Sequence, residues 1–173
     1  MIDIHNYNIH LRPLTREDIE QVRTWRNSEH VRSNMIYNSI ISADEQESWF
    51  DALDDKQHYY IIFKEAVSIG VINVKNIDKK MSTGEAGIFI GDLRFTESPI
   101  ALHAILALMD HYFDVLHFDS LEAKVLNENA TALFMNHKLG YQTTREDTIC
   151  KHLRVTRDDY HNATSQFRAL LSK

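Results

Sequence analysis

The segment Leu121–Tyr141, LEAKVLNENATALFMNHKLGY, contains the clearest structural signals in this chain. Leu121–Val125 alternates apolar and polar residues, which is typical of a strand with one buried face. Asn127 and Asn129 follow, and asparagine is a preferred residue immediately before a helix. The next residues predict a helix that stops at Gly140, because glycine favours helix termination, and extended chain resumes after it.

The rest of the chain has few glycines and prolines, so cap and strand signals define its elements. Helix starts are indicated at Thr15 with Asp18, Ser42 with Glu45, Ser98 before Pro99, and Thr156 with Asp159. Strands are predicted at Tyr7–Arg12, Tyr59–Phe63, Ser68–Val74 and Ala86–Ile90, with two more inside Gln142–Val155. The predicted order is β-α-α-β-β-β-α-β-α-β-β with a last helix to Leu171, which favours an α/β (α+β) mixed sheet with helices on both faces.

Length and composition define the class of protein. The 173 residues suit a single domain over 1–173, since no linker or repeat divides them. A formal net charge of −6 argues against general binding of nucleic acid or anionic membranes, which needs a basic face. Ile100–Met109 is too short to cross a bilayer, and the first ten residues lack a signal core. Cys150 is the only cysteine, which fits a reducing compartment, so a cytoplasmic location is expected.

The asparagine-rich turn, the helix length and the ending Lys138-Leu-Gly-Tyr141 together resemble the GNAT-type acyl-CoA N-acyltransferase fold. The order of elements, obtained independently, agrees with that layout. The resemblance implies a six- to seven-stranded mixed sheet flanked by helices. It also implies acetyl-CoA as co-substrate and transfer of its acetyl group to a primary amine. A homodimer is one of the assemblies in which this fold occurs.

The same resemblance implies which residues contact the cofactor. In this family, backbone groups of the strand equivalent to Ala86–Ile90 hold the pantetheine arm. Gly87 suits a close backbone approach there, although an ordinary bulge is an alternative explanation. The implied cofactor-binding residues are Gly87, Ile88, Phe89, Ile90, Ser98, Ala101, Leu102, Asn129 and Lys138.

Two departures from the family pattern concern the chemistry. The segment equivalent to the pyrophosphate loop places Glu97 and Pro99 where glycines usually stand. Proline donates no N–H and Glu97 adds negative charge, so weaker or differently arranged binding of coenzyme A is expected there. Asn136 occupies the position of a tyrosine acid and cannot release a proton at physiological pH, so it is expected to hydrogen-bond the thioester or coenzyme. Glu85 is the candidate general base, acting through water, unless it is only a solvated strand-end residue.

A second resemblance lies near the N-terminus. The pattern WRN, followed by Arg32 and Trp49, is similar to GNAT enzymes that acetylate nucleotide-linked deoxyamino sugars in the pathways to pseudaminic acid and related surface glycans. It implies that the substrate-binding residues are Trp25, Arg26, Asn27, Arg32 and Trp49. Arginine forks suit phosphates and aromatic faces suit a base or sugar ring. In the alternative interpretation, the tryptophans anchor the core and the arginines pair with local acids.

Three functions therefore remain open. The first is an N-acetyltransferase for a small-molecule nucleotide-linked amino sugar. The second is the same chemistry on a protein N-terminus or a small amine, because ribosomal-protein N-terminal acetyltransferases share part of the N-terminal pattern. The third is a GNAT-like module that binds acyl-CoA without turnover, which the altered loop motivates. The ten histidines form no HExxH motif or Cys/His cluster, so no metal site is expected, and Cys150 is interpreted as a packing residue of a strand.

Overall fold

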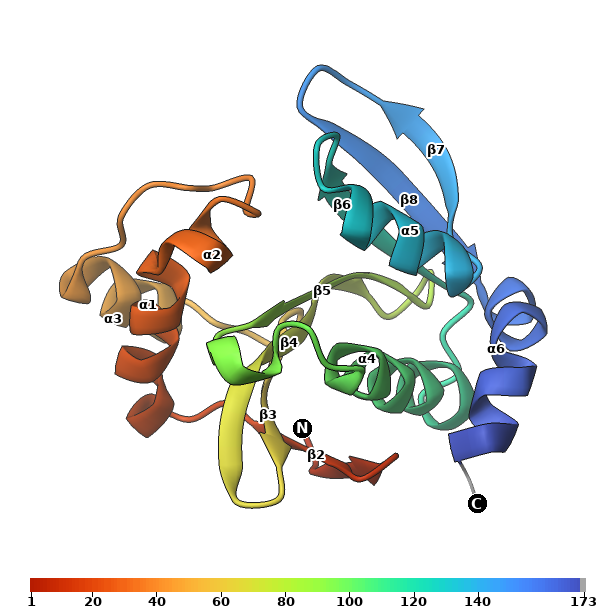
Figure 1. Ribbon diagram of the computed structural model, residues 1–173, viewed down its shortest axis with the longest axis horizontal. Helices are drawn as coiled ribbons and strands as arrows, with labels where there is room; N and C mark the ends of the chain where they lie inside the picture. The colour runs from red at the N-terminus through yellow and green to blue at the C-terminus, as the bar shows by residue number, and fades with distance from the viewer. Residues whose placement is uncertain (172–173) are drawn as a thin grey trace.

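The computed structural model describes residues 1–171, and its centre is one mixed sheet of eight strands (Figure 1). The strands are β1 (Ile4–Asn6), β2 (Ile9–Pro13), β3 (His58–Lys64), β4 (Val67–Asp78), β5 (Thr83–Ile90), β6 (Ser120–Leu126), β7 (Gln142–Glu146) and β8 (Cys150–Thr156). Their order across the sheet is β1-β2-β3-β4-β5-β6-β8-β7. Neighbouring strands are antiparallel except β5 and β6, which are parallel. The predicted mixed sheet is confirmed.

The sheet has more strands than the expected six or seven because the chain begins with a hairpin. It turns at Tyr7 and Asn8, whose φ angles are 51° and 58°. Two consecutive positive φ angles are the geometry of a tight two-residue turn between antiparallel strands. The turn lacks the Asn-Gly or Asp-Gly pair that usually marks it, so the pattern predicts one strand over Tyr7–Arg12 where the structure has β1 and β2.

Within residues 1–171, six α-helices flank the sheet: α1 (Ile19–Asn27), α2 (Glu29–Arg32), α3 (Ala43–Asp51), α4 (Ile100–Asp110), α5 (Ala130–Lys138) and α6 (Arg157–Leu171). The predicted cap of α3 is confirmed, because the Glu45 amide donates to Ser42 Oγ at 3.2 Å and the Ser42 amide donates to Glu45 Oε2 at 2.7 Å. Within residues 1–171, none of the helices has both the length and the apolar character that crossing a bilayer requires.

The helices cover two different faces because side chains alternate along the strands. Ile61 of β3 and Val71 of β4 join a core cluster with Val22 and Trp25 of α1. Their strand neighbours Ile62 and Ile72 point the other way, into the larger cluster with α4 and residues of α5 and α6. In Figure 1, α1–α3 accordingly lie on one side of β4 and β5, and α4 on the other.

The two parallel strands at the middle of the sheet separate after a short paired segment. β5 and β6 are in register at Thr83–Ser120, Gly84–Leu121 and Glu85–Glu122, the pairs found between them in the described part of the chain. Beyond Glu85, β5 continues to Ile90 paired with β4, while β6 continues to Leu126 paired with β8. The inner edges of the two strands therefore diverge into a fork, which Figure 1 shows between β5 and the β6–β8 arm.

Candidate active site

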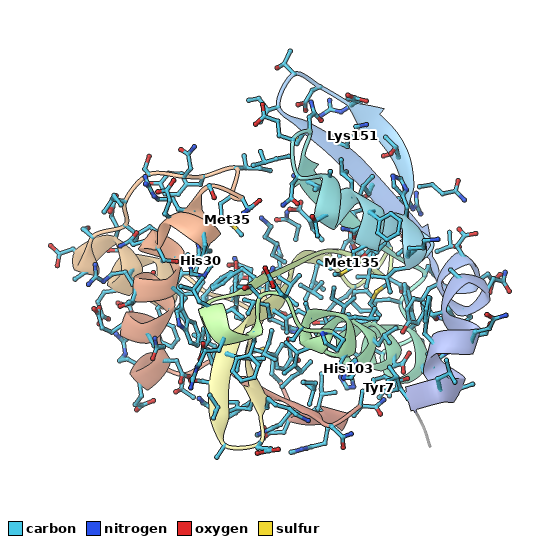
Figure 2. The ribbon with its side chains drawn as sticks, viewed as in Figure 1. Tyr7, His30, Met35, His103, Met135 and Lys151 are labelled. Atoms are coloured by element: carbon cyan, nitrogen blue, oxygen red, sulfur yellow. The ribbon has the colours of Figure 1, made fainter. Side chains whose placement is uncertain are left out.

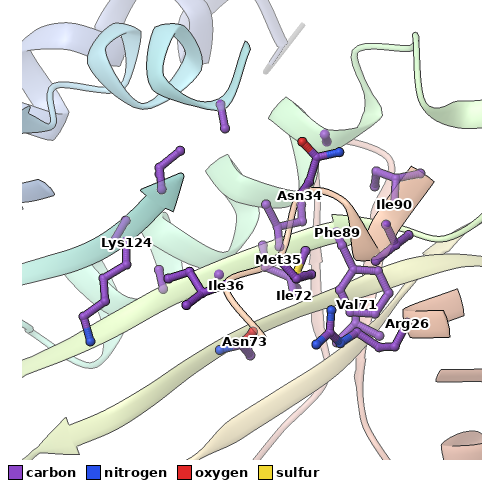
Figure 3. A pocket seen from close by; sticks show the side chains of 18 of the residues that line it. Arg26, Asn34, Met35, Ile36, Val71, Ile72, Asn73, Phe89, Ile90 and Lys124 are labelled. Carbon is purple, nitrogen blue, oxygen red and sulfur yellow. The ribbon is translucent and has the colours of Figure 1, made fainter. Parts of the chain in front are cut away.

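A cavity of about 800 Å³ lies at this fork. Its lining includes Val22 and Trp49, from the core cluster that joins α1 to β3 and β4 (the α1–α3 cluster). It also includes Leu108 and Val125, from the larger cluster around α4 (the α4 cluster). The cavity therefore passes from one face of the sheet to the other. In Figure 3, Met35 and Ile36 of the segment after α2 lie over the strands with Arg26 and Phe89, while Lys124 stands on β6. Figure 2 places His30 and Met35 on one side of this space and Met135 on the other.

The α4–α5 side of the cavity has the features that an acetyl-CoA molecule requires. The backbone edge of Ala86–Ile90 faces the fork without a strand partner among residues 1–171, so its amides and carbonyls are available to an extended ligand. Ala132 and Asn136 of α5 line the opposite wall. Asn129 also lines it and caps α5, because its Oδ1 accepts a hydrogen bond from the Ala132 amide at 3.0 Å.

The start of α4 departs from the usual glycine-rich cradle in a limited way. Thr96 and Ala101 line the cavity, and the amides of the first helical turn have no intrahelical partner. Ser98 does not line it: its hydroxyl donates to the Phe95 carbonyl at 2.7 Å. Leu102 does not line the cavity either, and packs against the α4 cluster. The residues present fit the cofactor, with phosphate contacts limited to helix amides and Thr96.

Glu85 lies where β5 and β6 begin to separate and is 7% exposed. Lys124 Nζ is 2.9 Å from its Oε2, and Lys75 Nζ is 3.1 Å from its Oε1. Burial acts to raise the pKa of Glu85, but the hydrogen bonds and charges of Lys124 and Lys75 outweigh it, so the pKa is below its ordinary value. The carboxylate is therefore ionised at neutral pH. All three side chains line the cavity.

Three buried nitrogen atoms at the α1–α3 end of the cavity have no hydrogen-bond partner among residues 1–171: Arg26 Nη1, His30 Nε2 and Gln46 Nε2. The Arg26 guanidinium lies 5.9 Å from the centroid of the Phe89 ring and donates through Nη2 to the Tyr37 carbonyl at 3.2 Å. Buried polar atoms are nearly always hydrogen-bonded in native proteins. Arg26 and Gln46 thus offer donors to a ligand, and His30 does so in one tautomer.

The remaining residues predicted to bind substrate divide into two groups. Arg26 and Trp49 line the cavity, and Trp49 packs edge-on against Tyr59 with ring centroids 5.0 Å apart. Trp25 is 8% exposed and belongs to the core, and it does not line the cavity. Asn27 uses both ends of its amide on the backbone of Ile41, each at 2.8 Å. It therefore holds the segment between α2 and α3 against α1.

Arg32 and Lys138 also lie outside the cavity lining. Arg32 Nη2 is 2.5 Å from Glu29 Oε2, and Nη1 donates to the Asn38 carbonyl at 3.3 Å. Lys138 Nζ stands 5.3 Å from the centroid of the Phe134 ring on the exposed side of α5. Asn136 lines the cavity, and its Nδ2 donates to the Ala132 carbonyl at 2.8 Å. Its Oδ1 is the atom left to face a ligand.

The cavity lining also includes polar residues that were not among the predicted site residues, such as His30, Gln46, Lys75 and Lys124. Of these, Gln46 had a usable signal, because it belongs to the same N-terminal pattern as Arg32 and Trp49. Lys75 on β4 and Lys124 on β6 are 49 positions apart in the chain, so only the fold brings both of them to Glu85.

Comparison with known proteins agrees with this geometry. Residues 8–142 match the family model described as acetyltransferase (GNAT) domain. No curated protein matches the chain. Among solved structures, a spermidine N-acetyltransferase from Vibrio cholerae in complex with CoA and spermine is 19% identical, with a TM-score of 0.78 and coverage of 90% of this chain and 99% of that one.

FdhC, described as a nucleotide-linked sugar GNAT, is 18% identical with a TM-score of 0.82, and the match covers 98% of each chain. An uncharacterised protein from Bacillus halodurans has a TM-score of 0.83 at 15% identity, covering 98% of this chain and 97% of that one. At these identities the neighbours establish the fold, while the family model, which matches residues 8–142, establishes membership. The chain belongs to the GNAT acetyltransferase family, and the prediction of an acetyl-CoA-dependent N-acetyltransferase is confirmed.

Proposed function

We propose that the chain acetylates the primary amine of a nucleotide-linked deoxyamino sugar. The observation that supports this most is the set of buried nitrogens on Arg26, His30 and Gln46 that have no partner among residues 1–171. They suit a ligand rich in hydrogen-bond acceptors. Phosphate oxygens and sugar hydroxyls are such acceptors, and an arginine fork suits a diphosphate in particular.

A polyamine fits this cavity less well. Spermidine offers cationic donors and no acceptor groups, and the ionisable groups around the cavity already include more cations than carboxylates. The cations are Arg26, Lys75 and Lys124, and the carboxylates are Glu45 and Glu85. Of these two, Glu85 is paired with both lysines. Like charges repel in a partly buried site where screening by water is weak, so an anionic substrate is favoured over a polycation.

Side chains alternate between the two faces of β5, and this separates the sites for the amine and for acetyl-CoA. Glu85, Gly87 and Phe89 share one face of β5, and Phe89 packs against the α1–α3 cluster, so this is the face toward Arg26 and Trp49. The intervening Ala86 and Ile88 pack against the α4 cluster. We therefore place the amine on the α1–α3 side and the cofactor along the peptide edge of β5, with Asn136 Oδ1 available to it. When bound, acetyl-CoA supplies the acetyl thioester.

Glu85 then orients the amine. Its ionised carboxylate accepts a hydrogen bond from the amine, but two lysines stabilise the charged form, so it takes up a proton less readily than a free glutamate. As the amine nitrogen bonds to the acetyl carbon and the thiolate departs, the amine proton therefore passes to solvent water beside the carboxylate and does not stay on Glu85. Because a thiol with a pKa of about 8.5 is a fair leaving group, Asn136 is not required to act as an acid. Holding the reactants together is the larger contribution.

The direct test is acetyl transfer measured as release of thiol from acetyl-CoA. The amines are a UDP-linked deoxyamino sugar, spermidine and a short peptide with a free N-terminus. We expect kcat/KM for the sugar nucleotide to exceed that for spermidine by more than about 100-fold, because unpaired buried donors penalise a substrate without acceptors. A preference for spermidine or for the peptide would reject the sugar assignment. Stabilisation by acetyl-CoA without thiol release on any amine would support a binding module instead.

The Arg26→Ala variant locates the site. We expect it to raise KM for the sugar nucleotide by more than about tenfold, because a buried charge-assisted contact to phosphate is lost. The dissociation constant of coenzyme A should change little, since Arg26 lies on the other side of the sheet. Arg16→Ala is the matched control, because Arg16 pairs on the surface with Glu47 and Asp51. Equal KM values in the wild type and in Arg26→Ala would remove Arg26 from the substrate site.

A further inference from the structure

The hairpin of β7 and β8 brings together three metal-ligating side chains outside the acetyl-transfer cavity. Asp147 lies in the turn, Cys150 begins β8 and His152 follows two residues later, on the same face of the strand. Lys151, which lies between the last two, marks this hairpin in Figure 2. The Asp147 amide donates to the Cys150 carbonyl at 3.0 Å, which closes the turn and turns the carboxylate back onto the strand.

The three ligand atoms lie close to the spacing of a tetrahedral site. Cys150 Sγ is 3.7 Å from His152 Nε2 and 3.7 Å from Asp147 Oδ2, and the last two atoms are 3.0 Å apart. Zinc bonds thiolate at about 2.3 Å and imidazole or carboxylate at about 2.0–2.2 Å, which places such donors about 3.4–3.6 Å apart around one ion. Shifts of a few tenths of an ångström would complete the geometry.

The surrounding groups orient these ligands. Asp147 Oδ1 accepts hydrogen bonds from the amides of Ile149 and Cys150, both at 2.9 Å, which leaves Oδ2 facing the sulfur and the imidazole. Asn127 Nδ2 donates to the Asp147 carbonyl at 2.9 Å and ties the turn to the end of β6. The amide hydrogen bonds, followed by that of His152, lower the pKa of Asp147 well below its ordinary value, so the carboxylate is ionised. Hydrogen bonds that orient the ligand residues in this way are typical of metal sites in proteins.

We propose that Asp147, Cys150 and His152 form a binding site for one divalent transition-metal ion of the zinc class, with a fourth position open to water. A mixed sulfur, nitrogen and oxygen set suits zinc or cobalt better than the hard ions magnesium and calcium. The sequence gives no warning of this site, because Asp-x-x-Cys-x-His matches no established zinc spacing. Cys150 is buried at the start of β8, as expected of a packing residue, and the proposal gives its sulfur a second role.

Arg145 competes with the ion. Its Nη2 is 2.8 Å from His152 Nε2 and 3.5 Å from Asp147 Oδ2, so the guanidinium faces the same ligand atoms. The Arg145 side chain is 67% exposed, so it can move into solvent when an ion binds. Its removal should therefore tighten metal binding, whereas loss of a true ligand should weaken it. These opposite expectations separate the proposed site from nonspecific binding to a histidine-rich surface.

The test is a cobalt titration of the metal-stripped full chain under a reductant that contains no thiol. We expect one Co²⁺ per chain at saturation, with a thiolate-to-cobalt charge-transfer band. This band reports the proposed site alone, because Cys150 is the only cysteine. Zn²⁺ should then displace cobalt and abolish the band. Absence of the band at saturating cobalt would overturn the proposal.

Variants complete the test. Cys150→Ser should abolish the band, and His152→Gln should weaken zinc affinity by at least the roughly 10- to 100-fold that follows loss of an outer-shell partner. Arg145→Ala should strengthen it. The matched control is His5→Gln with His10→Gln, which removes the other group of metal-ligating residues within residues 1–171, formed with Asp3. If this control loses the band, or if Arg145→Ala and His152→Gln bind zinc as the wild type does, the site is wrong. Unchanged circular dichroism confirms that each variant is folded.

Discussion

Gly91 lies directly against the indole ring of Trp25: a methyl group on its α carbon would come within 2.1 Å of Trp25 Cγ. This contact joins the residue after β5 to α1, and the Gly91 amide also donates to the Ile69 carbonyl at 2.9 Å. The tryptophan that the sequence offers as a substrate ligand therefore sets the distance between α1 and the sheet. Arg26, the next residue, is held over the cavity as a consequence.

The Gly91→Ala variant should lose stability. The added methyl group cannot be relieved by a flexible side-chain end, because its neighbours are atoms of a buried ring. Overpacking of this kind costs about 1–3 kcal/mol. Urea unfolding of the two proteins measures the difference, and Trp25→Phe in the Gly91→Ala background should recover part of it. An alanine variant with wild-type stability would show that α1 is not packed as described.

Gly87→Ala is expected to change binding instead of stability. A methyl group there would meet the Asn73 side-chain amide at 3.1 Å, a contact that a small rotation of the amide relieves. Gly87 and Asn73 both line the cavity on the α1–α3 side. We expect nearly unchanged unfolding, a KM for the acceptor amine raised severalfold, and little change in coenzyme A affinity. Isothermal titration with coenzyme A, compared with steady-state KM for the amine, separates the two sites. A loss confined to coenzyme A would place the cofactor on this face.

Most of the fold could be predicted because its signals are local. The capping pair Ser42–Glu45 and the cap Asn129 form the contacts that their residue types favour. The hairpin of β1 and β2 could not be predicted in the same way, since Tyr7 and Asn8 adopt positive φ without glycine. Alternation then misplaces the start of the first strand, and the sheet contains one more strand than expected.

The site was less predictable than the fold, because pairing across the sheet determines it. Glu85 was identified from its place on a strand, but its two lysine partners come from β4 and β6. Arg32 has the residue type that phosphate recognition needs, yet Glu29 and the Asn38 carbonyl occupy its guanidinium. Six residues earlier, near the end of α1, Arg26 has the same chemistry; both arginines have a buried nitrogen without a partner among residues 1–171, but of the two only Arg26 lines the cavity. The sequence correctly indicated arginine as the residue type, but it could not show which arginine side chain points into the cavity.

Buried Asp110 joins three elements that are distant in the sequence, so removal of one of its hydrogen-bond partners should lower the free energy of unfolding. The Tyr7 hydroxyl donates to its Oδ2 at 2.5 Å, and the Tyr160 hydroxyl donates to its Oδ1 at 2.7 Å. Because hydrogen bonds to charged groups contribute about 1.5–3 kcal/mol, Tyr160→Phe should lower the free energy of unfolding by that amount. Tyr37→Phe, at an exposed tyrosine, should change it by less than about 0.5 kcal/mol. Equal effects of the two variants would exclude a structural role for the Asp110 contacts.

The contribution of Glu85 to stability should depend on pH with a defined sign. Its pKa in the folded protein is lower than the ordinary value of 4.5, which it regains on unfolding, so its stabilisation is complete above that value. As pH falls through the folded pKa, the carboxylate takes up a proton and its ion pairs with Lys75 and Lys124 are lost. The stability difference between the wild type and Glu85→Gln should therefore be largest near neutral pH and shrink below pH 4.5. Urea unfolding of both proteins across this range measures it, with Glu97→Gln as the control because Glu97 is exposed. A difference that grows toward acid pH would mean that Glu85 is held as the neutral acid, and the orienting role of its carboxylate would then be wrong.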